Sequence, residues 1–579
     1  MKSRGLLRTT VVALAIAGAA CSSSTSGGNN QTGGGPGTGG ESGSGGRVGS
    51  GGTSATGGSV GSGGSVTTGG VTGNGGASAT GGRVGSGGSV VSGGTTGSGG
   101  AVGSGGASTV VGGTISSGGQ PGNGGATGRP DAGPDAGASG GRSGSGGSAA
   151  GGTGPGAGGT TAPVTCGSTA VYVGTKTPGT APAGAITVDP GKTYQIVDGF
   201  GLADVWQGSS SATMQTALWD PVNGIGLNLL RVGIDGTSGK PNIMGAAGYA
   251  DGQACVKFAG CACKVWAAPW SPPAGDKDNN NVNNGGHLNT SAYASWAAIL
   301  AAFPAFYKQN GGVDLYAISA QNEPDFTASY QSCLFDKTTM VNFINVLGPL
   351  LAALSPPVKV LAAEPDNWGN IWGGDGYGPA IIADSKADSY VGPIATHDYG
   401  STSAGTYGRP APPANNTHHV WETECTPGDT GPITIATMVY AAFSTGGVNG
   451  WHYWWTEAFV PNASSPPAQY YALGNFSKFV RPGYYRVDVS GAAKASGTVP
   501  LVVAFSNQAD GTVAIVVVNG GSAQQASFFV AGAAWPASVT PYVTTSSSKL
   551  AAGTAITVTA GAFSASLAAQ SVTTFVGKP

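Results

Sequence analysis

Two glutamates stand where the sequence pattern predicts that a β-strand ends. Glu323 closes an apolar run that begins at Ile318, and Pro324 directly after it stops a strand. Glu424 closes a second apolar run, in which Glu422 is an alternative carboxylate. A pair of carboxyl groups that converges on a sugar can hydrolyse a glycosidic bond, because one protonates the leaving oxygen while the other attacks the anomeric carbon or activates water. Glu323 and Glu424 are therefore the candidate catalytic pair.

Glu422 and Glu424 compete for the second place in this pair. Side chains alternate between the two faces of a strand, so residues two apart are expected on the same face. In a barrel, the active site lies at the C-terminal ends of the strands, where the last residue of a strand is the better placed. This favours Glu424 over Glu422.

These carboxylates need elements that bring two strand ends together. Short apolar runs alternate with amphipathic stretches, such as residues 292–308 and 337–354, as in parallel βα units. The strand candidates are residues 196–201, 228–235, 264–271, 315–322, 359–363, 392–399, 418–423 and 450–456. Eight such units predict an α/β fold, a (β/α)8 TIM barrel, in which the fourth and seventh strands face each other across the mouth. An open doubly wound sheet is the alternative, but residues 199–202 lack its glycine-rich phosphate turn.

The chain around the active-site residues divides into distinct parts. The predicted catalytic barrel covers residues 163–478. Residues 479–579 hold short β-branched runs separated by turn signals, which predict an attached antiparallel β-sandwich. Residues 22–162 are rich in Gly, Ser and Thr and indicate a disordered tether, because such a segment buries too little apolar surface to offset its ordering entropy.

Residues 1–21 are typical of an export signal. Three basic residues precede an apolar run, residues 11–17, that is too short to span a membrane, and small residues then lead to Cys21. This arrangement resembles a bacterial lipoprotein signal, in which Cys21 would be lipidated, although Gly18 stands where leucine is usual. Ordinary signal-peptidase cleavage is the alternative. Either route predicts an extracellular or cell-surface protein, lipid-anchored to the outer membrane or secreted.

Cysteines and histidines bear on metal chemistry. Besides Cys21, the cysteines are Cys166, Cys255, Cys261, Cys263, Cys333 and Cys425. An even set in an exported chain predicts disulfide bonds, whose connectivity the spacing leaves open. The cluster at residues 255–263 could instead bind a metal, but no pair of histidines lies near it. The five histidines never form the His-x-x-x-His spacing of a helical zinc site, so the sequence predicts no catalytic metal and no cofactor.

Composition narrows the class of partner. Charged residues make up 9% of the chain and the formal net charge is −2, which fits a neutral polymer and disfavours nucleic acid. Aromatic rings at strand ends can stack on the apolar faces of sugar rings. The aromatic residues at or near predicted strand ends are Trp206, Trp270, Tyr399, Trp451, Tyr453, Trp454 and Trp455. Core packing is the alternative for each residue, but as a set around one barrel mouth they predict polysaccharide subsites.

A series of short motifs runs in order from about Ile186 to the C-terminus. They are Asp198-Gly199-Phe200-Gly201, Leu230-Arg231-Val232, Ala268-Pro269-Trp270-Ser271-Pro272-Pro273, residues 315–325, His397-Asp398-Tyr399-Gly400, Trp421-Glu422-Thr423-Glu424, residues 476–484 and residues 570–576. Together they make this part of the chain resemble glycoside hydrolase family 30, most closely its bacterial xylanase branch.

The resemblance implies a retaining double displacement with Glu323 as acid/base and Glu424 as nucleophile, whose carboxyl groups should lie about 5–5.5 Å apart. Arg231 would lie near Glu424 and help to keep it ionised, because a nearby cation lowers a carboxylate pKa. His397 would support the site. The residues implied to bind substrate are Trp206, Trp270, Asn322, Tyr399 and Trp455. The family pattern also implies that residues 163–195 contribute in part to the β-domain.

One departure from the family pattern bears on the substrate. The glucuronoxylan-specific branch carries an arginine just after the paired tryptophans of the eighth strand, whereas Thr456 and Glu457 follow them here. Because Glu457 would repel an acidic branch, we expect an endo-β-1,4-xylanase that does not depend on glucuronate. The protein is also expected to be a monomer. A β-1,6-galactanase or β-1,6-glucanase of the same family is an alternative, and so is a surface lipoprotein that binds polysaccharide without cutting it.

Overall fold

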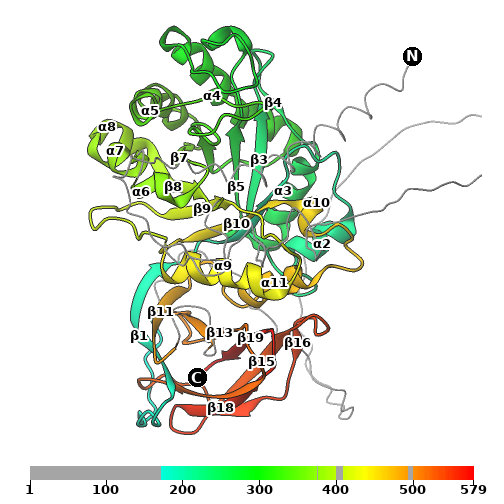
Figure 1. The fold of residues 1–579 in the computed structure, drawn as a ribbon, viewed down its shortest axis with the longest axis vertical. Coiled ribbons are helices and arrows are strands. Elements are labelled where there is room, and N and C mark those ends of the chain that lie inside the picture. Colours follow the sequence, from blue (N-terminus) through cyan, green and yellow to red (C-terminus); the bar gives the residue numbers. More distant parts are fainter. Residues whose placement is uncertain (1–170, 374–375, 400–408, 493–499) are drawn as a thin grey trace, which may run out of the picture. The chain divides into compact units, whose positions relative to one another are not determined.

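The computed structural model describes residues 171–373, 376–399, 409–492 and 500–579 (Figure 1). The predicted export signal with its lipidated Cys21, and the predicted tether at residues 22–162, lie outside the described residues and stay predictions. Among the helices of the described segments, none combines the length and the apolar character that crossing a membrane requires.

Within the described segments, eight parallel strands close into a barrel (Figure 1). They are β2 (Gly199–Ala203), β3 (Leu229–Asp235), β5 (Lys264–Pro269), β6 (Ala317–Ser319), β7 (Lys359–Ala363), β8 (Val391–His397), β9 (Val420–Glu424) and β10 (Gly450–Trp455). The ring closes because β2 pairs with both β10 and β3. A short strand, β4 (Asn242–Ile243), adds to β3 in the antiparallel sense. The predicted (β/α)8 barrel is confirmed.

The first predicted strand is displaced by a few residues. Ile196 ends β1 (Ile186–Ile196), which belongs to a different sheet, and the barrel strand β2 starts only at Gly199. The chain turns between the two strands at Gly199, whose φ of 137° is accessible to glycine and strained for other residues.

Helices surround the barrel, and the two amphipathic stretches predicted at residues 292–308 and 337–354 form two of them, α4 and α5. They are α2 (Ala212–Trp219), α3 (Ala247–Ala259), α4 (Tyr293–Gly311), α5 (Lys337–Ala352), α6 (Trp368–Trp372), α7 (Tyr377–Ala383), α8 (Ser385–Tyr390), α9 (Pro432–Ser444), α10 (Thr456–Phe459) and α11 (Ala468–Ser477), with 3-10 turns at Gly260–Ala262, Ala274–Asp276 and Thr290–Ala292. In α5, Asp336 caps the first turn by accepting from the backbone N–H of Thr339. The apolar stripe of α5, from Met340 to Leu351, is buried against the barrel.

A second, mostly antiparallel sheet follows the barrel. Its strands are β1, β11 (Tyr485–Ser490), β12 (Leu501–Ser506), β13 (Val513–Asn519), β14 (Gln524–Val530), β15 (Ser538–Thr544), β16 (Ala551–Ala552), β17 (Ile556–Thr557), β18 (Ala562–Leu567) and β19 (Ser571–Gly577). Phe528 of β14 and Phe575 of β19 stand far apart in the strand order, yet their ring centroids are 5.3 Å apart. The sheet therefore folds over its own apolar core, as a sandwich does.

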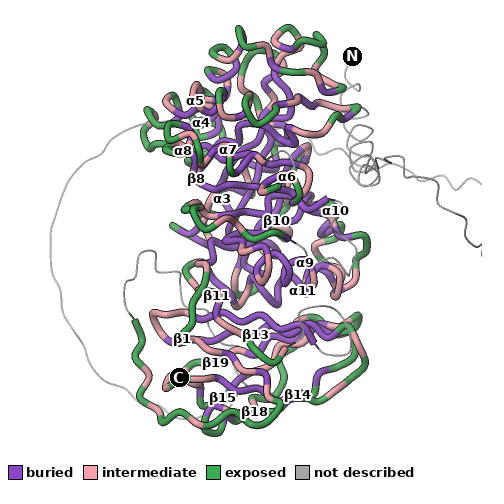
Figure 2. The backbone as a smooth tube through the Cα atoms, turned by 60° about the vertical axis from the view of Figure 1, so that its left-hand side comes forward, coloured by how far each residue is buried: buried purple, intermediate pink, exposed green. Residues whose placement is uncertain are grey.

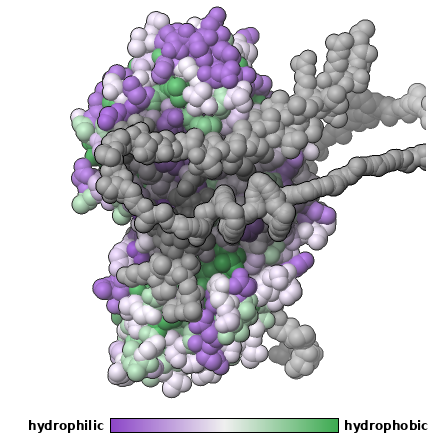
Figure 3. Space-filling model, viewed as in Figure 1, coloured by the Kyte–Doolittle hydropathy of each residue, from purple (hydrophilic) through white to green (hydrophobic). Residues whose placement is uncertain are grey.

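The barrel and the second sheet meet through α9 and α11. Helix α11 contacts β15 and β19, and α9 contacts β12, β13 and β19. At the centre of this contact the side-chain amide of Asn475 donates to the backbone oxygen of Tyr542 and to Thr574 Oγ1. Hydrophilic side chains gather instead at the other end of the barrel, beyond α4 and β4 (Figures 1 and 3).

Large side chains fill the barrel interior and form an apolar floor beneath the strand ends. Trp266 and Trp421 lie with their ring centroids 6.3 Å apart, and Trp266 Nε1 donates to Nε2 of His452. Burial lowers the pKa of His452 to about 3, so this imidazole is neutral and can accept that bond. Buried residues concentrate along these strands (Figure 2), as expected for a packed barrel core.

The cysteines pair less completely than the sequence suggested. Cys255 and Cys263 form a disulfide, which confirms the disulfide interpretation of that cluster, and Cys261 is also disulfide-bonded. Cys333 and Cys425 are free, buried thiols, so the expectation that all six would pair is wrong. Each of the two is enclosed in its own part of the core, Cys333 in the loop after β6 and Cys425 directly after β9, and burial raises the pKa of both thiols.

The Cys255–Cys263 disulfide ties the end of α3 to the start of β5. Replacing both residues with serine should lower the free energy of unfolding by about 2.5 kcal/mol, the amount expected from closing a loop of this length. Urea unfolding of the double variant, followed by tryptophan fluorescence, measures the effect. A midpoint equal to that of the unmodified chain would contradict the expectation.

Candidate active site

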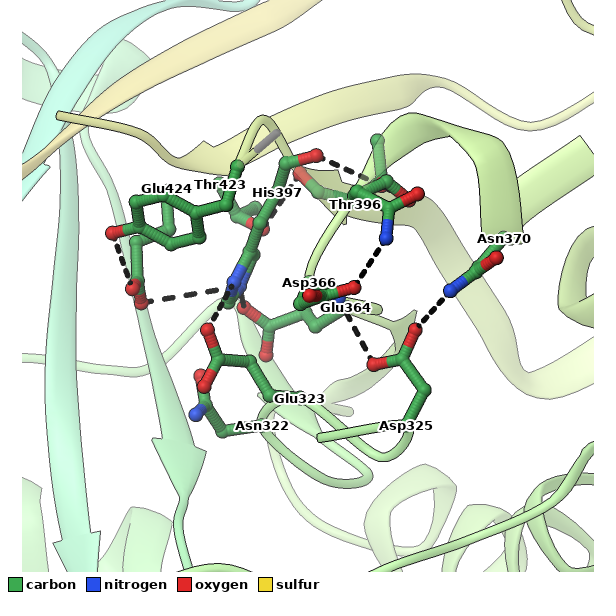
Figure 4. Close-up of polar contacts among 12 residues, drawn as sticks. Asn322, Glu323, Asp325, Glu364, Asp366, Asn370, Thr396, His397, Thr423 and Glu424 are labelled. Atoms are coloured by element: carbon green, nitrogen blue, oxygen red, sulfur yellow. Dashed lines mark hydrogen bonds and ion pairs between the residues drawn. The ribbon is translucent and has the colours of Figure 1, made fainter. Parts of the chain in front are cut away.

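Glu323 and Glu424 converge at the C-terminal end of the barrel (Figure 4). Glu323 follows β6 and Glu424 is the last residue of β9, and both carboxyl groups are almost completely buried. One carboxylate oxygen of Glu323 lies within 4.8 Å of one of Glu424. The fold thus brings together two residues that are 101 positions apart in the chain (424 − 323).

Glu422 faces away from this pair. Its carboxylate accepts a hydrogen bond from Trp368 Nε1 at 3.1 Å and lies 3.4 Å from Nε of Arg409, outside the barrel interior. The expectation that Glu422 and Glu424 share a face is wrong, because the register between β8 and β9 shifts: Thr396 is opposite Glu422, but His397 is opposite Glu424. The extra residue in β9 makes a β-bulge, which reverses the alternation at this point.

His397, the last residue of β8, connects the two candidate glutamates (Figure 4). Its Nδ1 lies 3.4 Å from Glu323, and its Nε2 lies 3.9 Å from Glu424 and 3.2 Å from Glu364. Burial opposes a charge on His397, but Glu424, Glu323 and Glu364 together raise its pKa to about 10. The imidazole is therefore a cation at neutral pH, with both ring nitrogens donating.

Arg231 on β3 is the second cation of the site and is fully buried. One guanidinium nitrogen donates to Glu424, and another donates to Asn322 and, at 2.9 Å, to Glu364. The Trp270 ring covers the guanidinium at 4.9 Å. Arg231 therefore lies beside Glu424, at the position expected for it.

Glu364 is a site residue that the sequence analysis missed. It directly follows β7, is completely buried, and lies in reach of both cations, Arg231 and His397. Burial opposes its charge, yet Arg231 and His397 hold its pKa below the ordinary value of a glutamate. A signal was present: Glu364 is followed by Pro365, so this strand ends in a carboxylate and a proline just as the strand before Glu323 does.

The charge on Glu424 depends on its neighbours. Burial raises its pKa, and the nearby Glu323 adds to that rise, whereas His397, Arg231 and a hydrogen bond from Tyr399 oppose it. The Tyr399 hydroxyl donates to Glu424 at 2.8 Å, and burial next to the two glutamates raises the pKa of this phenol far above its usual value. Tyr399 therefore stays protonated and acts as a hydrogen-bond donor.

The protonation of His397 predicts a loss of stability in alkaline solution. Its folded-state pKa, about 10, is above the ordinary value of 6.5, so its contribution is complete below about pH 6.5 and is lost as the pH rises toward 10. We expect the free energy of unfolding to fall across this window. Urea unfolding from pH 6 to pH 10 measures it, and a His397→Gln variant, which cannot take up the proton, should show a flatter dependence. Equal slopes for the two proteins would contradict the assignment.

The predicted aromatic residues occupy different depths. Trp206, with a φ of 62°, and Trp455 are half-buried at the mouth, and Trp455 Nε1 donates to the backbone oxygen of Val205. Trp270 is 2% exposed, and its ring packs against Trp206 at 5.2 Å between centroids. The mouth therefore presents Trp206 and Trp455, and Trp270 lies behind them as support.

The remaining predicted aromatic residues all belong to β10 and lie on its two opposite faces. Trp454 points into the barrel and contacts both Trp206 and Trp270, whereas Trp451 and Tyr453 pack among the helices outside it. The last two are core residues, as the core-packing alternative allowed.

Two more side chains complete the site. Asn322 is buried and its amide oxygen accepts from Arg231, so its NH2 group is turned away from the cation. Tyr330, in the loop after β6, was not predicted; it packs on the apolar floor, and burial together with the charges of Glu323 and Glu424 raises its pKa. No strand-end signal marks Tyr330, because its position depends on the path of a loop.

The group Glu323, His397 and Glu424 also has the spacing of a metal site. A histidine ligand must offer an unprotonated nitrogen. Both ring nitrogens of His397 face carboxylates, and its pKa of about 10 keeps them protonated at neutral pH. The group therefore suits a network of ion pairs better than a bound cation.

Comparison with protein families agrees with this geometry. Residues 253–421 match the model described as the glycosyl hydrolase family 30 TIM-barrel domain. This segment carries β5 to β8 with the candidate residue Glu323, and it ends inside β9.

Similar proteins match a larger share of the chain than the family model does. The glucuronoxylanase XynC of Bacillus subtilis (strain 168) is 27% identical over 413 residues, which cover 68% of this chain and 92% of that protein. The structure of a family 30 endoxylanase from Clostridium papyrosolvens C71 is 29% identical with a TM-score of 0.57, covering 68% of this chain and 100% of that one. The family 30 subfamily 8 xylanase Xyn30A from Clostridium acetobutylicum is 29% identical with a TM-score of 0.59, covering 69% and 100%.

Proposed function

The chain belongs to glycoside hydrolase family 30, and on that premise we propose that it cleaves β-1,4-xylan as an endo-acting, retaining enzyme. The relatives that match over nearly their whole length include a glucuronoxylanase and endoxylanases, which supports a xylan-like polysaccharide as the substrate. The two carboxyl groups at the mouth of the barrel supply the chemistry that such a reaction needs.

The observation that carries the proposal is the separation of Glu323 and Glu424. Their nearest carboxylate oxygens lie within 4.8 Å of each other. Inverting enzymes hold the two carboxyl groups roughly 6.5–9.5 Å apart to leave room for a water, whereas retaining enzymes hold them about 5–5.5 Å apart. The short distance favours direct attack on the sugar by one of the two carboxylates.

We assign the attack to Glu424 because both cations and Tyr399 support its charge. Its carboxylate attacks the anomeric carbon while Glu323 gives its proton to the leaving oxygen, so the glycosidic bond breaks and an ester forms on Glu424. Glu323, now ionised, then takes a proton from water, and that water attacks the same carbon and releases Glu424.

The residues at the mouth support binding of an extended, uncharged sugar chain. Trp206 and Trp455 offer half-buried ring faces beside the pair, and the NH2 group of Asn322 can donate to a sugar hydroxyl. Glu457, two residues after Trp455, is exposed, and with the Gln207 side-chain amide turned to satisfy both of its ends, the amide nitrogen donates to the Glu457 carboxylate at 2.7 Å. A fixed negative charge at this point disfavours an acidic branch and supports the proposal that glucuronate is not required.

Product analysis tests the reaction. The purified chain would be incubated with β-1,4-xylan, and proton NMR would follow the anomeric signals in the first minutes. We expect β-anomeric ends to appear first and a mixture of xylo-oligosaccharides to accumulate. α-Anomeric ends would refute retention, and release of xylose alone would refute endo action. Cleavage of β-1,6-glucan or β-1,6-galactan with no cleavage of xylan would refute the substrate.

Matched xylans test the branch requirement. Linear xylan and the same polymer carrying glucuronate branches should be cut at similar rates, or the linear one faster. The Glu457→Gln variant removes the charge while keeping the side-chain size, and it should raise the relative rate on the branched polymer. A requirement for the branch in the unmodified chain would refute this part of the proposal.

A further inference from the structure

Three carboxylates, one from each of three strand ends, surround the imidazole of His397 (Figure 4). Two belong to the proposed catalytic pair, and the third, Glu364, has no part in the reaction as proposed. We propose that Glu364 is a positioning residue that holds the proton on His397, so that this imidazole remains a cation in contact with both reacting glutamates throughout the double displacement. The inference rests on the proposed function.

The contacts of Glu364 place it behind the reacting groups. Its carboxylate oxygen lies 3.2 Å from Nε2 of His397 and 2.9 Å from a guanidinium nitrogen of Arg231, and its side chain has no exposure to solvent. The pair is deep enough that water does not screen it, so the electrostatic contact is stronger than at a surface. Substrate at the mouth would meet Glu323 and Glu424 rather than Glu364.

The backbone of Glu364 also helps to place Glu323. Its carbonyl oxygen accepts from the backbone N–H of Glu323 at 3.0 Å, and its own N–H donates to Ala395. Both glutamates have positive φ values, 43° for Glu323 and 61° for Glu364, which residues other than glycine seldom adopt. Such strained positions persist where the surrounding structure imposes them and often mark functional sites. One residue thus ties the acid/base strand end to the imidazole.

Charge accounting gives a reason for this arrangement. In the proposed mechanism, Arg231 and His397 are cations before the reaction, Glu364 and Glu424 are anions, and Glu323 carries the proton that it will donate, so the net charge of these five groups is zero. In the covalent intermediate, Glu424 is a neutral ester and Glu323 is the anion, so the net charge is again zero. One negative charge moves from one side of His397 to the other while the imidazolium contacts both positions.

Without Glu364, the same cluster would carry a net positive charge, which would favour loss of the proton from His397. The groups in contact with this imidazole are Glu323, Glu364 and Glu424 from neighbouring strand ends, Arg231 from β3, and Tyr399 from its own segment, and the carboxyl group of Asp366 interacts with it electrostatically without a direct contact. Of the three carboxylates in contact with the imidazole, Glu364 is the one whose charge stays constant in the proposed cycle. A neutral imidazole keeps a single N–H, so His397 could no longer donate toward Glu323 through Nδ1 and toward Glu364 and Glu424 through Nε2 at the same time.

The protonation state can be observed directly, without substrate. The full chain, labelled with ¹⁵N-histidine, would be titrated from pH 6 to pH 10.5, and the ring nitrogens followed by NMR. The His397 signals are those lost in a His397→Asn variant. In the unmodified chain we expect both ring nitrogens to stay protonated to about pH 10. In Glu364→Gln, which keeps the shape but not the charge, we expect deprotonation at a clearly lower pH.

Glu422→Gln is a matched control. Glu422 is also a fully buried carboxylate, but its partners are Trp368 and Arg409. The same change of charge there should leave the His397 titration unmoved. Glu364→Asp keeps the charge on a shorter side chain and should restore part of the protonated state, which a purely steric role would not explain.

Kinetics provide an independent measurement. On xylan, Glu364→Gln should lower kcat by about 100-fold, the usual size for loss of one preorganised electrostatic group, with little change in KM. An unchanged His397 titration in Glu364→Gln would overturn the inference. A His397 titration near pH 6.5 in the unmodified chain would also overturn it, and that measurement does not depend on any variant being folded. If the unmodified chain cuts no polysaccharide, the proposed function fails, while the NMR result still decides the role of Glu364 in holding the proton.

Discussion

Glu424→Ala should lower kcat on xylan by on the order of 10⁵-fold, because it removes the group that forms the covalent bond to the sugar in the proposed mechanism. The Arg231 and Tyr399 contacts that support the carboxylate would then have no charge to act on. Reducing-sugar release measures the loss. Circular dichroism of the variant checks that the fold remains.

Added azide distinguishes the two glutamates. In Glu424→Ala, azide can enter the space of the lost carboxylate and attack a substrate with a good leaving group, which gives a product of inverted, α configuration. In Glu323→Ala, the ester on Glu424 still forms from such a substrate, and azide then attacks the ester from the other face to give a β product. The configuration of the azide product, read by NMR, therefore assigns each role.

Glu422→Ala provides the comparison for this experiment. Its carboxylate lies on the outer face of β9, so its loss should leave the covalent step intact. An α-azide product from Glu422→Ala, with full activity in Glu424→Ala, would contradict the assignment of the nucleophile. A β product from Glu424→Ala would exchange the proposed roles of Glu323 and Glu424.

Arg231→Met should destabilise the fold by about 3–5 kcal/mol, because it leaves buried carboxylates without the cation that compensates them. The guanidinium contacts Glu424, Glu364 and Asn322 at once, and its side chain is completely buried. A lysine places a single ammonium group there and cannot donate to all three in the same geometry, so Arg231→Lys should recover only part of the loss. Urea unfolding at pH 7 measures both variants.

The stability of the Arg231→Met variant should depend on pH in a defined direction. Without Arg231, the folded-state pKa values of Glu364 and Glu424 should rise above their unfolded values. A raised carboxylate pKa favours folding at low pH and loses that contribution as the pH increases, so Arg231→Met should be relatively more stable near pH 4 than near pH 7. Activity should fall as well, because a protonated Glu424 cannot attack the sugar.

Arg409→Met is the control for burial of an arginine. Arg409 is buried and pairs with Asp398 and Glu422, away from the catalytic pair. Its loss should also lower stability, but the folded protein should keep a kcat close to that of the unmodified chain. Equal losses of kcat in the two variants would show that Arg231 acts only through the fold.

The barrel and the positions of its two main glutamates could be predicted from the sequence. Strand candidates were recognisable because buried parallel strands are short apolar runs between amphipathic helices, a pattern that depends on neighbouring residues alone. Glu323 and Glu424 followed from their places at strand ends, since parallel strands in a barrel direct those ends to one mouth. Arg231, His397, Asn322 and Tyr399 were expected at the site through family motifs.

Other features depended on contacts between distant segments. The bulge that separates Glu422 from Glu424 arises where β9 pairs with β8, and the pattern of β9 by itself suggested regular alternation. Trp270 was expected at the mouth, and only the structure shows that its ring is 2% exposed and packs against Trp206 and Trp454. Cys333 and Cys425 formed an even set with the other cysteines, yet each is a free thiol in the folded core.

Sequence alone thus determined which strand ends carry the candidate carboxylates, because strand periodicity and chain order are local properties. Only the tertiary structure decided how those carboxylates are held. Glu364 has the same strand-end pattern as Glu323, and its meaning depends on Arg231 and His397, which lie 133 and 33 positions away along the chain. Charge compensation in a buried site is set by distances between strands, and these exist only once the barrel has closed.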